Sequence, residues 1–158
     1  MRKPKKLLSE AETIAILQSC SSGVLAVSGD NGYPYAVPLS YAYKDGKLYF
    51  HSAVEGHKID AISNNDKVSF CVIKTDDVVP EKFTTLFRSV IVFGRARILT
   101  DDYEKKHALE CLVEKYSPNF IAEGQTEIKR SWDRFNAVEI QIEHMTGKAS
   151  TELIVNQA

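Results

Sequence analysis

The chain has 158 residues, of which 44% are hydrophobic and 26% are charged. This length allows one domain with a sizeable core and is short for two, so residues 1–158 are expected to form a single domain. Twenty Lys and Arg residues against 21 Asp and Glu residues leave a formal net charge of −1. That balance gives no support for binding to nucleic acid or to an anionic membrane surface.

The cysteines and the hydropathy pattern indicate the cellular compartment in which the protein is expected. The three cysteines, Cys20, Cys71 and Cys111, are far apart and odd in number, which argues against a disulfide framework and favours a reducing compartment. No uninterrupted apolar run approaches the roughly 20 residues that a membrane-spanning helix needs. We therefore expect a cytoplasmic protein that makes no use of a membrane.

The first predicted element is a helix that begins after Ser9. Ser9 and Glu12 have the spacing of a capping box, and apolar residues then recur at helical spacing. A short apolar strand over 23–28 and an Asn-Gly turn lead to a second strand over 33–43. This strand contains two prolines, which cannot donate ladder hydrogen bonds, so we expect it to be interrupted or to lie at a sheet edge.

The middle of the chain continues the pattern of strands and tight turns. Gly94 interrupts its most strand-like run and indicates a β-bulge or a close approach of another backbone. The predicted elements are strands over 48–53 and 67–74, a short helix over 58–63, a polar loop over 76–82 and a long strand within 83–99.

The C-terminal third predicts a second long helix and a last strand. The helix begins at Asp101 and ends at Ser117-Pro118, and strict alternation over 137–143 indicates a half-buried strand. Residues 119–135 are ambiguous, with a short helix expected near 127–132. Six or seven short strands and two flanking helices favour a mainly β fold, a small antiparallel barrel; an α/β fold is weaker because turns, not helices, separate most strands.

One segment has the composition of a phosphate site. Ser52 ends a predicted strand, Gly56 lies in the following loop, and Lys58 stands where the next helix begins. A helix start offers unpaired N–H groups and partial positive charge, and an ammonium and a hydroxyl add further donors. By spacing alone, a solvated lysine beside a glycine loop is the commoner outcome for such a segment.

Other chemistries have less support. His51, at the end of the same strand, suits proton transfer near neutral pH, although a histidine there is more often structural. The four histidines lack metal-ligand spacing, so no metal site is expected. The chain contains no G-x-x-x-x-G-K-[ST], G-x-G-x-x-G or G-x-S-x-G motif.

Five ordered blocks carry a resemblance to a known family. The chain resembles the flavin-binding split-barrel proteins related to pyridoxamine 5'-phosphate oxidase, and within them the branch that includes the nitroimidazole-resistance (Nim-type) reductases. The blocks are GYPYAVPLSY at 32–41, LYFHSA at 48–53, GHKID at 56–60, KVSF at 67–70 and SVIVFGRA at 89–96.

The resemblance implies a six-stranded antiparallel split β-barrel, a homodimer, and FMN in each of two clefts at the subunit interface. It places His51 on the substrate side of the flavin, as the catalytic residue. It also implies that the strand beginning at Ser89 contributes to the cleft, either of its own subunit or of the neighbouring one. The residues it assigns to cofactor binding are Val37, Pro38, Leu39, Ser40, Phe50, His51, Ser52, Gly56, His57, Lys58 and Ser89.

Two functions of different classes remain open at this point. The first is an oxidoreductase that passes electrons from NAD(P)H through FMN to a small acceptor, such as a nitro compound. The second is a non-enzymatic module that stores, senses or carries FMN, or a related ligand such as haem or F420. The residues that bind pyridoxal phosphate in the true oxidases have no clear counterparts in this chain, so that vitamin reaction is not expected.

Overall fold

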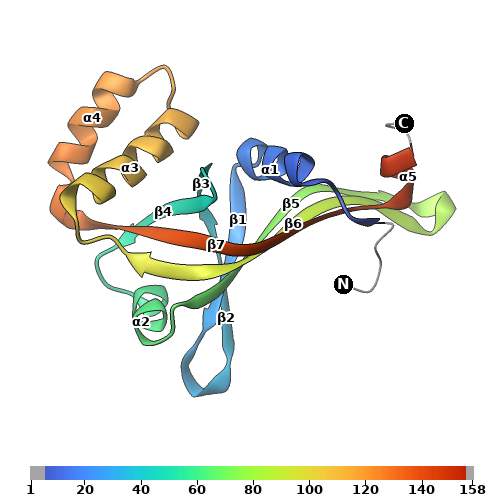
Figure 1. The fold of residues 1–158 in the computed structure, drawn as a ribbon, viewed down its shortest axis with the longest axis horizontal. Coiled ribbons are helices and arrows are strands. Elements are labelled where there is room, and N and C mark those ends of the chain that lie inside the picture. The colour runs from blue at the N-terminus through green and yellow to red at the C-terminus, as the bar shows by residue number, and fades with distance from the viewer. Residues whose placement is uncertain (1–5, 156–158) are drawn as a thin grey trace.

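A computed structural model describes residues 6–155. Its centre is one seven-stranded antiparallel sheet with the strand order β2-β1-β5-β6-β7-β4-β3 (Figure 1). The strands are β1 (Ser22–Ser28), β2 (Pro34–Ser40), β3 (Ala42–Lys44), β4 (Lys47–Ala53), β5 (Lys67–Val79), β6 (Thr84–Ile98) and β7 (Phe135–Ala149). The helices are α1 (Glu10–Ser19), α2 (His57–Asn64), α3 (Asp102–Tyr116), α4 (Ile121–Arg130) and α5 (Thr151–Val155). The predicted mainly β fold with flanking helices is confirmed, with seven strands in place of six.

The additional strand arises where the sheet curls back on itself. β2 and β3 are the two edge strands, and Tyr41 alone separates them in the chain, so the edges meet at this residue without a closed hydrogen-bond ladder. The expected interruption and edge position of the proline-containing strand are therefore both confirmed. Side chains of α3 hold the junction: the Tyr41 N–H donates to Tyr116 Oη (2.9 Å), and Lys115 Nζ donates to the Tyr41 carbonyl oxygen (2.8 Å).

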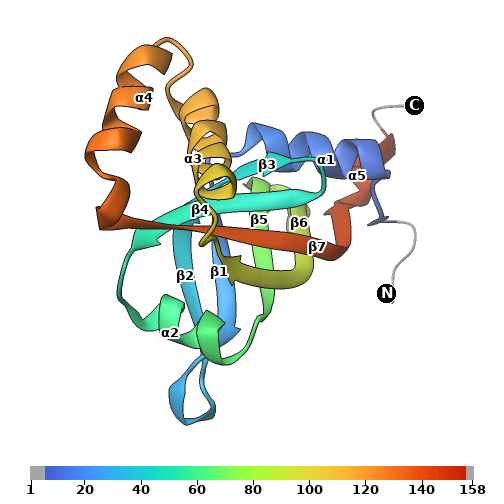
Figure 2. The ribbon, with the colours of Figure 1, turned by 60° about the vertical axis from the view of Figure 1, so that its left-hand side comes forward.

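The inside of the curled sheet is the main hydrophobic core. α1 and α2 cover it from two sides, as Figure 2 shows, and each contributes apolar side chains to it. The Ser9–Glu12 capping box that starts α1 is present as predicted. The largest fully buried side chains of this core are Tyr41, Phe50, Phe70, Leu17, Leu25 and Leu48.

The structure differs from the prediction between the strands expected over 67–74 and within 83–99. β5 continues to Val79, and β5 and β6 pair as far as Val79–Thr84, so residues 75–87 form a two-stranded arm that leaves the body of the molecule (Figure 1). The predicted loop over 76–82 is wrong for its first half. The segment leading into α5 contacts the base of the arm, where the Ser150 N–H donates to the Phe87 carbonyl oxygen, but no residue of 75–87 belongs to the main hydrophobic core. The arm therefore lacks the apolar alternation that marks a strand packed on a core.

Gly94 lies at a register shift between β6 and β7, where Glu143 of β7 is left without a partner in the ladder, and a Cβ at Gly94 would collide with the Gln141 carbonyl oxygen. Both the predicted bulge and the predicted close backbone approach are therefore present.

α3 and α4 form a helical hairpin on the outer side of the sheet (Figure 2). α3 begins at the predicted cap, where Asp101 Oδ1 accepts from the Glu104 N–H at 3.0 Å. α4 starts six residues before the short helix expected near 127–132, and no side chain among the described residues caps its start, so the sequence carries no start signal. A second apolar cluster fixes the hairpin against Tyr49 and Ala137 of the sheet. Over residues 6–155, no helix has the length and hydropathy needed to cross a bilayer.

Candidate functional site

The start of α2 has the features of an anion site. Gly56 precedes the helix with φ 144° and ψ 160°, a backbone conformation that is essentially restricted to glycine. Within the described part of the chain, no side chain caps the first N–H groups of α2. The helix therefore begins with donors that are free to meet an anion, and the glycine lets a ligand come close to the backbone.

Ser52 supplies a polar atom without a partner. Its side chain lies on the side of β4 that faces the core, two positions after Phe50, and only 5% of the residue is exposed. Among the described residues, nothing forms a hydrogen bond with Ser52 Oγ. A buried hydroxyl without a partner costs about 1–3 kcal/mol, so this atom is a candidate to bind an external group.

The loop between Ser52 and Gly56 is held by the neighbouring strand. Asn136 of β7 pairs with Ser52 in the ladder, and its Nδ2 donates to the Val54 carbonyl oxygen at 3.0 Å. This contact fixes the path of the chain from the end of β4 to the start of α2. The hydroxyl, the glycine and the helix start thus belong to one supported segment.

The Lys58 ammonium is part of the electrostatic environment of His51. Partial burial of the imidazole lowers the pKa of His51, and the Lys58 ammonium lowers it further. The ring of His51 lies edge-on to Phe135, with 5.2 Å between the ring centroids. His51 is consequently neutral at neutral pH, with one ring nitrogen that can donate a hydrogen bond and one that can accept.

His57 is oriented differently from the other predicted phosphate ligands. Its Nδ1 lies 3.4 Å from Asp30 Oδ2 in the β1–β2 turn, and its ring contacts Tyr35 edge-on. The side chain of His57 is therefore engaged with the turn, while its backbone stays at the first position of α2.

A cavity lies between β4 and the α3–α4 hairpin. It has a volume of about 580 Å3, and both Ser40 and His51 line it. The structure thereby brings together one predicted residue of β2 and the predicted catalytic residue of β4. The remaining wall comes from the helical hairpin and from Phe135.

Alternate side chains of β2, the strand that the resemblance places along the flavin ring, point to opposite faces of the sheet. Val37 and Leu39 pack against the main core, and Phe50 of β4 is fully buried in it. Pro38 and Ser40 point to the opposite, outer face, where both are exposed. Only backbone atoms of Val37, Leu39 and Phe50 are open to a ligand on the outer face.

Ser89 is remote from the other predicted residues within one chain. It pairs with Lys148, whereas Ile98 at the far end of β6 pairs with Val138, beside the His51–Ala137 pair. Nine positions from Ser89 to Ile98 correspond to roughly 30 Å of strand. Within one copy of the chain, Ser89 therefore lies far along the sheet from His51.

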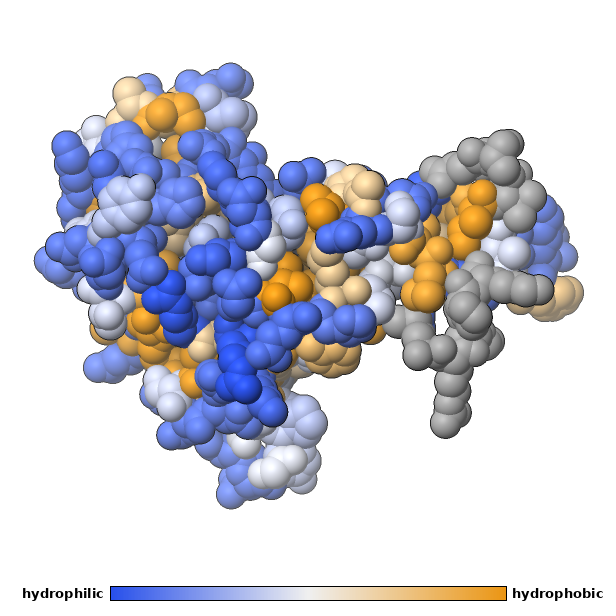
Figure 3. Space-filling model, viewed as in Figure 1, coloured by the Kyte–Doolittle hydropathy of each residue, from blue (hydrophilic) through white to orange (hydrophobic). Residues whose placement is uncertain are grey.

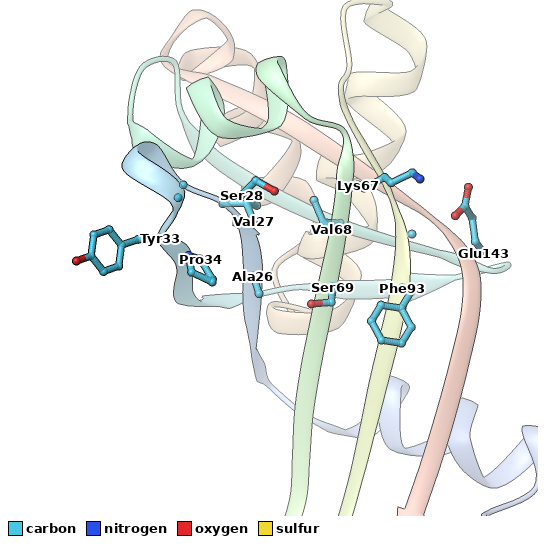
Figure 4. Close-up of a pocket in the computed structure, with 13 residues that line it drawn as sticks. Ala26, Val27, Ser28, Tyr33, Pro34, Lys67, Val68, Ser69, Phe93 and Glu143 are labelled. Atoms are coloured by element: carbon cyan, nitrogen blue, oxygen red, sulfur yellow. The ribbon is translucent and has the colours of Figure 1, made fainter. Parts of the chain in front are cut away.

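A second hollow, of about 540 Å3, lies beside the β1–β2 turn and contains none of the predicted site residues. Figure 4 shows Ser69 and Phe93 side by side in it, with Lys67 and Glu143 on one side. It lacks both a buried polar atom without a partner and a helix start. We therefore place the candidate site at α2 and the His51 cavity.

Sequence reasoning missed the residues that α3 and α4 bring to the cavity. Leu109, Leu112, Phe120 and Ile128 are close to His51 only because the helical hairpin folds over β4. The apolar stripe of α3 predicted that this helix packs on something, but it could not identify the surface.

The comparisons with known proteins identify the family and the fold. The sequence profile described as pyridoxamine 5'-phosphate oxidase matches residues 9–149. The chain belongs to this family. An uncharacterized protein of Rhizobium meliloti is 29% identical over 153 residues, covering 92% of this chain and 95% of its own length.

Two solved structures extend the comparison. An FAD-binding protein from Mesorhizobium loti is 29% identical, with a TM-score of 0.64, covering 92% of this chain and 97% of that one. A protein of Bacteroides thetaiotaomicron, provisionally assigned as a 5-nitroimidazole antibiotic resistance protein, is 21% identical with a TM-score of 0.74, covering 90% and 86%. The latter likeness is evidence for the fold alone.

Proposed function

We propose that this member of the pyridoxamine 5'-phosphate oxidase family is an FMN-dependent oxidoreductase. It takes electrons from NAD(P)H and delivers them to a small acceptor, with nitro compounds as the first class to test. The observation that carries the proposal is the buried Ser52 hydroxyl, which has no partner among the described residues, beside a helix start without a side-chain cap.

The donor set fits a phosphate monoester. Ser52 Oγ, the N–H groups at the start of α2 and the Lys58 ammonium would hold the FMN phosphate. Gly56 has no side chain to obstruct it, and the backbone of β2 near Pro38 and Ser40 would lie along the ring. When bound, FMN supplies hydride and electron transfer, which no amino-acid side chain provides.

His51 acts on the acceptor in this proposal. Its imidazole lines the cavity that would hold the acceptor, where the N–H of the neutral ring can donate a hydrogen bond to an acceptor oxygen on which negative charge develops. The helical hairpin excludes water from one side of that cavity, which strengthens the hydrogen bond.

The proposal includes a homodimer with the flavin at its interface. Strand pairing places Pro38, Val24, Cys71 and Ile91 in one row across β2, β1, β5 and β6, on the outer face of the sheet. The neighbouring Phe93 is 51% exposed. A continuous apolar row of this kind is a candidate protein interface, and a second copy would also supply Ser89, which within one chain lies far from the site.

Hydrophobic side chains extend this face onto the arm. Ile73, just before the arm, is 63% exposed, and on the arm Val78 is 69% and Phe83 at the tip is 98% exposed. Figure 3 shows hydrophobic residues among hydrophilic ones on the body and a small hydrophobic area at the end of the arm. Ile91→Glu tests the interface, since Ile91 is an exposed position. We expect dimeric wild-type protein and a monomeric variant in light scattering, with FMN retained only by the dimer. A wild-type monomer that retains FMN would contradict the interface.

Enzyme assay separates the proposed function from its main competitor. Steady NAD(P)H oxidation that depends on both bound FMN and an added nitro acceptor is the expected result. A bound cofactor that turns over slowly or not at all would favour a binding module. The relative named for FAD binding, and a Mycobacterium smegmatis protein named for binding FAD and heme, make FAD and haem the other ligands to test.

A further inference from the structure

The cavity between β4 and the α3–α4 hairpin is lined mainly by apolar side chains, with a few polar groups. Five of its apolar side chains, Leu109, Leu112, Val113, Phe120 and Ile128, come from the hairpin or the turn within it. Its volume of about 580 Å3 is within the range of small-molecule sites, roughly 300–1,000 Å3. Phe120 is 59% exposed, so its ring is open to contact with an aromatic ligand.

The charged side chains in the cavity lining are both acidic, and one of them, Glu127, is ion-paired with Arg130 outside the lining. Glu123 and Glu127 line it, and none of the described lining residues is Lys or Arg. Hydrogen bonding from Ser131 and the nearby Arg130 lower the pKa of Glu127, which therefore stays ionised at neutral pH. His51, at the inner end, is neutral there because its own pKa is lowered.

We infer that this cavity is the acceptor site and that it selects a largely apolar, planar molecule that is uncharged or cationic, and rejects anions. The lining buries an aromatic body, and the neutral imidazole of His51 and the Ser40 hydroxyl offer hydrogen bonds. Glu127 is paired with Arg130, so the repulsion of phosphates and sulfonates comes mainly from the Glu123 carboxylate. A phosphorylated substrate, such as pyridoxamine 5'-phosphate, has no cation to bind in this cavity.

The inference rests on the proposed function, since it names the ligand as the electron acceptor. Ser40 and His51 belong both to the cavity and to the proposed ring site, so the two sites adjoin. The phosphate end at Ser52 and Lys58 lies outside the cavity lining. Binding in the cavity and retention of the flavin can therefore be measured separately.

The test uses three redox-inert probes that differ in charge: naphthol, naphthalene sulfonate and naphthylmethylamine. Calorimetric titration of FMN-loaded protein is expected to show binding of naphthol and of the amine, with the sulfonate about tenfold weaker or undetectable. Equal binding of the sulfonate, or no binding of naphthol, would overturn the inference. Displacement of FMN by naphthol would also overturn it, because the cavity would then be the cofactor's own site.

Two pairs of variants locate the binding. Phe120→Ala should weaken naphthol binding by about tenfold, the scale expected for losing one aromatic contact, whereas Ile121→Ala, at the next exposed position outside the lining, should not. Glu123→Lys should strengthen sulfonate binding by roughly threefold, and Glu114→Lys, outside the lining on α3, should leave it unchanged. Equal effects within either pair would place the probe elsewhere.

Failure of the inference and failure of the proposed function give different results. Protein that binds naphthol at the mapped position but does not retain FMN contradicts the proposed function. Protein that retains FMN but does not discriminate among the probes contradicts the inference alone.

Discussion

The two ends of the candidate site are built in different ways. The phosphate end consists of a buried hydroxyl, a glycine, a helix start and a lysine within residues 52–58, so all its donors come from one short segment of the chain. The acceptor end joins Ser40 and His51 to a helical hairpin far along the chain, and it is lined mainly by apolar side chains. The first end should decide whether the cofactor is retained, and the second should decide what reacts and how fast.

The variant expected to have the largest effect is His51→Ala. Loss of a positioned hydrogen-bond donor to a developing negative charge typically slows a reaction by about a hundredfold or more, and the side chain lines the cavity rather than the phosphate end. We expect turnover with a nitro acceptor to fall on this scale while FMN affinity stays near that of the wild type. Steady-state kinetics and FMN titration measure the two quantities; unchanged turnover would make His51 structural.

Lys58→Ala should lower FMN affinity rather than turnover, the reverse of the result expected for His51→Ala. Removal of one charge-assisted hydrogen bond should weaken FMN binding by about 1.5–3 kcal/mol, roughly 10- to 150-fold. At saturating FMN, turnover should recover. Lys129→Ala is the matched control, since Lys129 lies in the last turn of α4, outside the α2 segment and the cavity lining. Equal FMN affinity in both variants would remove Lys58 from the phosphate site.

Ser52→Ala should change stability and affinity in opposite directions. The variant loses a hydroxyl that has no partner among the described residues, so cofactor-free protein should become more stable by about 1 kcal/mol. Its FMN affinity should fall by a similar amount. In Ser63→Ala, by contrast, the free energy of unfolding should decrease, because Ser63 Oγ donates to the Ile59 carbonyl oxygen at 2.9 Å. Urea titration without FMN distinguishes the two signs.

The smallest effect concerns the titration of His51. Burial and the Lys58 charge lower its pKa in the folded state, so the unfolded chain takes up a proton first as the pH falls through about 6.5. Stability contributed by neutral His51 is present above that pH and is lost below it. His51→Gln should therefore lose less unfolding free energy than the wild type between about pH 7.5 and about pH 5.5. An identical loss in both proteins would show that His51 does not titrate in this way.

The fold could be predicted from the sequence wherever a local signal existed. Ser9 and Glu12 start α1 as expected, and the prolines of 33–43 mark the edge of the sheet at which Tyr41 separates two strands. The arm over 75–87 and the start of α4 were not predicted, since the first has no core to face and the second has no cap among the described residues.

The same division holds for the site. Ser52, Gly56 and Lys58 lie within one short segment, so the chemistry of a phosphate site was visible in their order. The proximity of Phe120 and Glu123 to His51 depends on how the α3–α4 hairpin packs against β4. The spacing of residues along the chain does not predict that packing.

The most direct test of the central claim is the visible absorption spectrum of the protein after addition of FMN and removal of the excess on a desalting column. The proposed site predicts flavin bands that stay with wild-type protein and are strongly reduced for Lys58→Ala. A colourless wild-type protein after the same treatment would contradict the FMN site at Ser52 and Lys58.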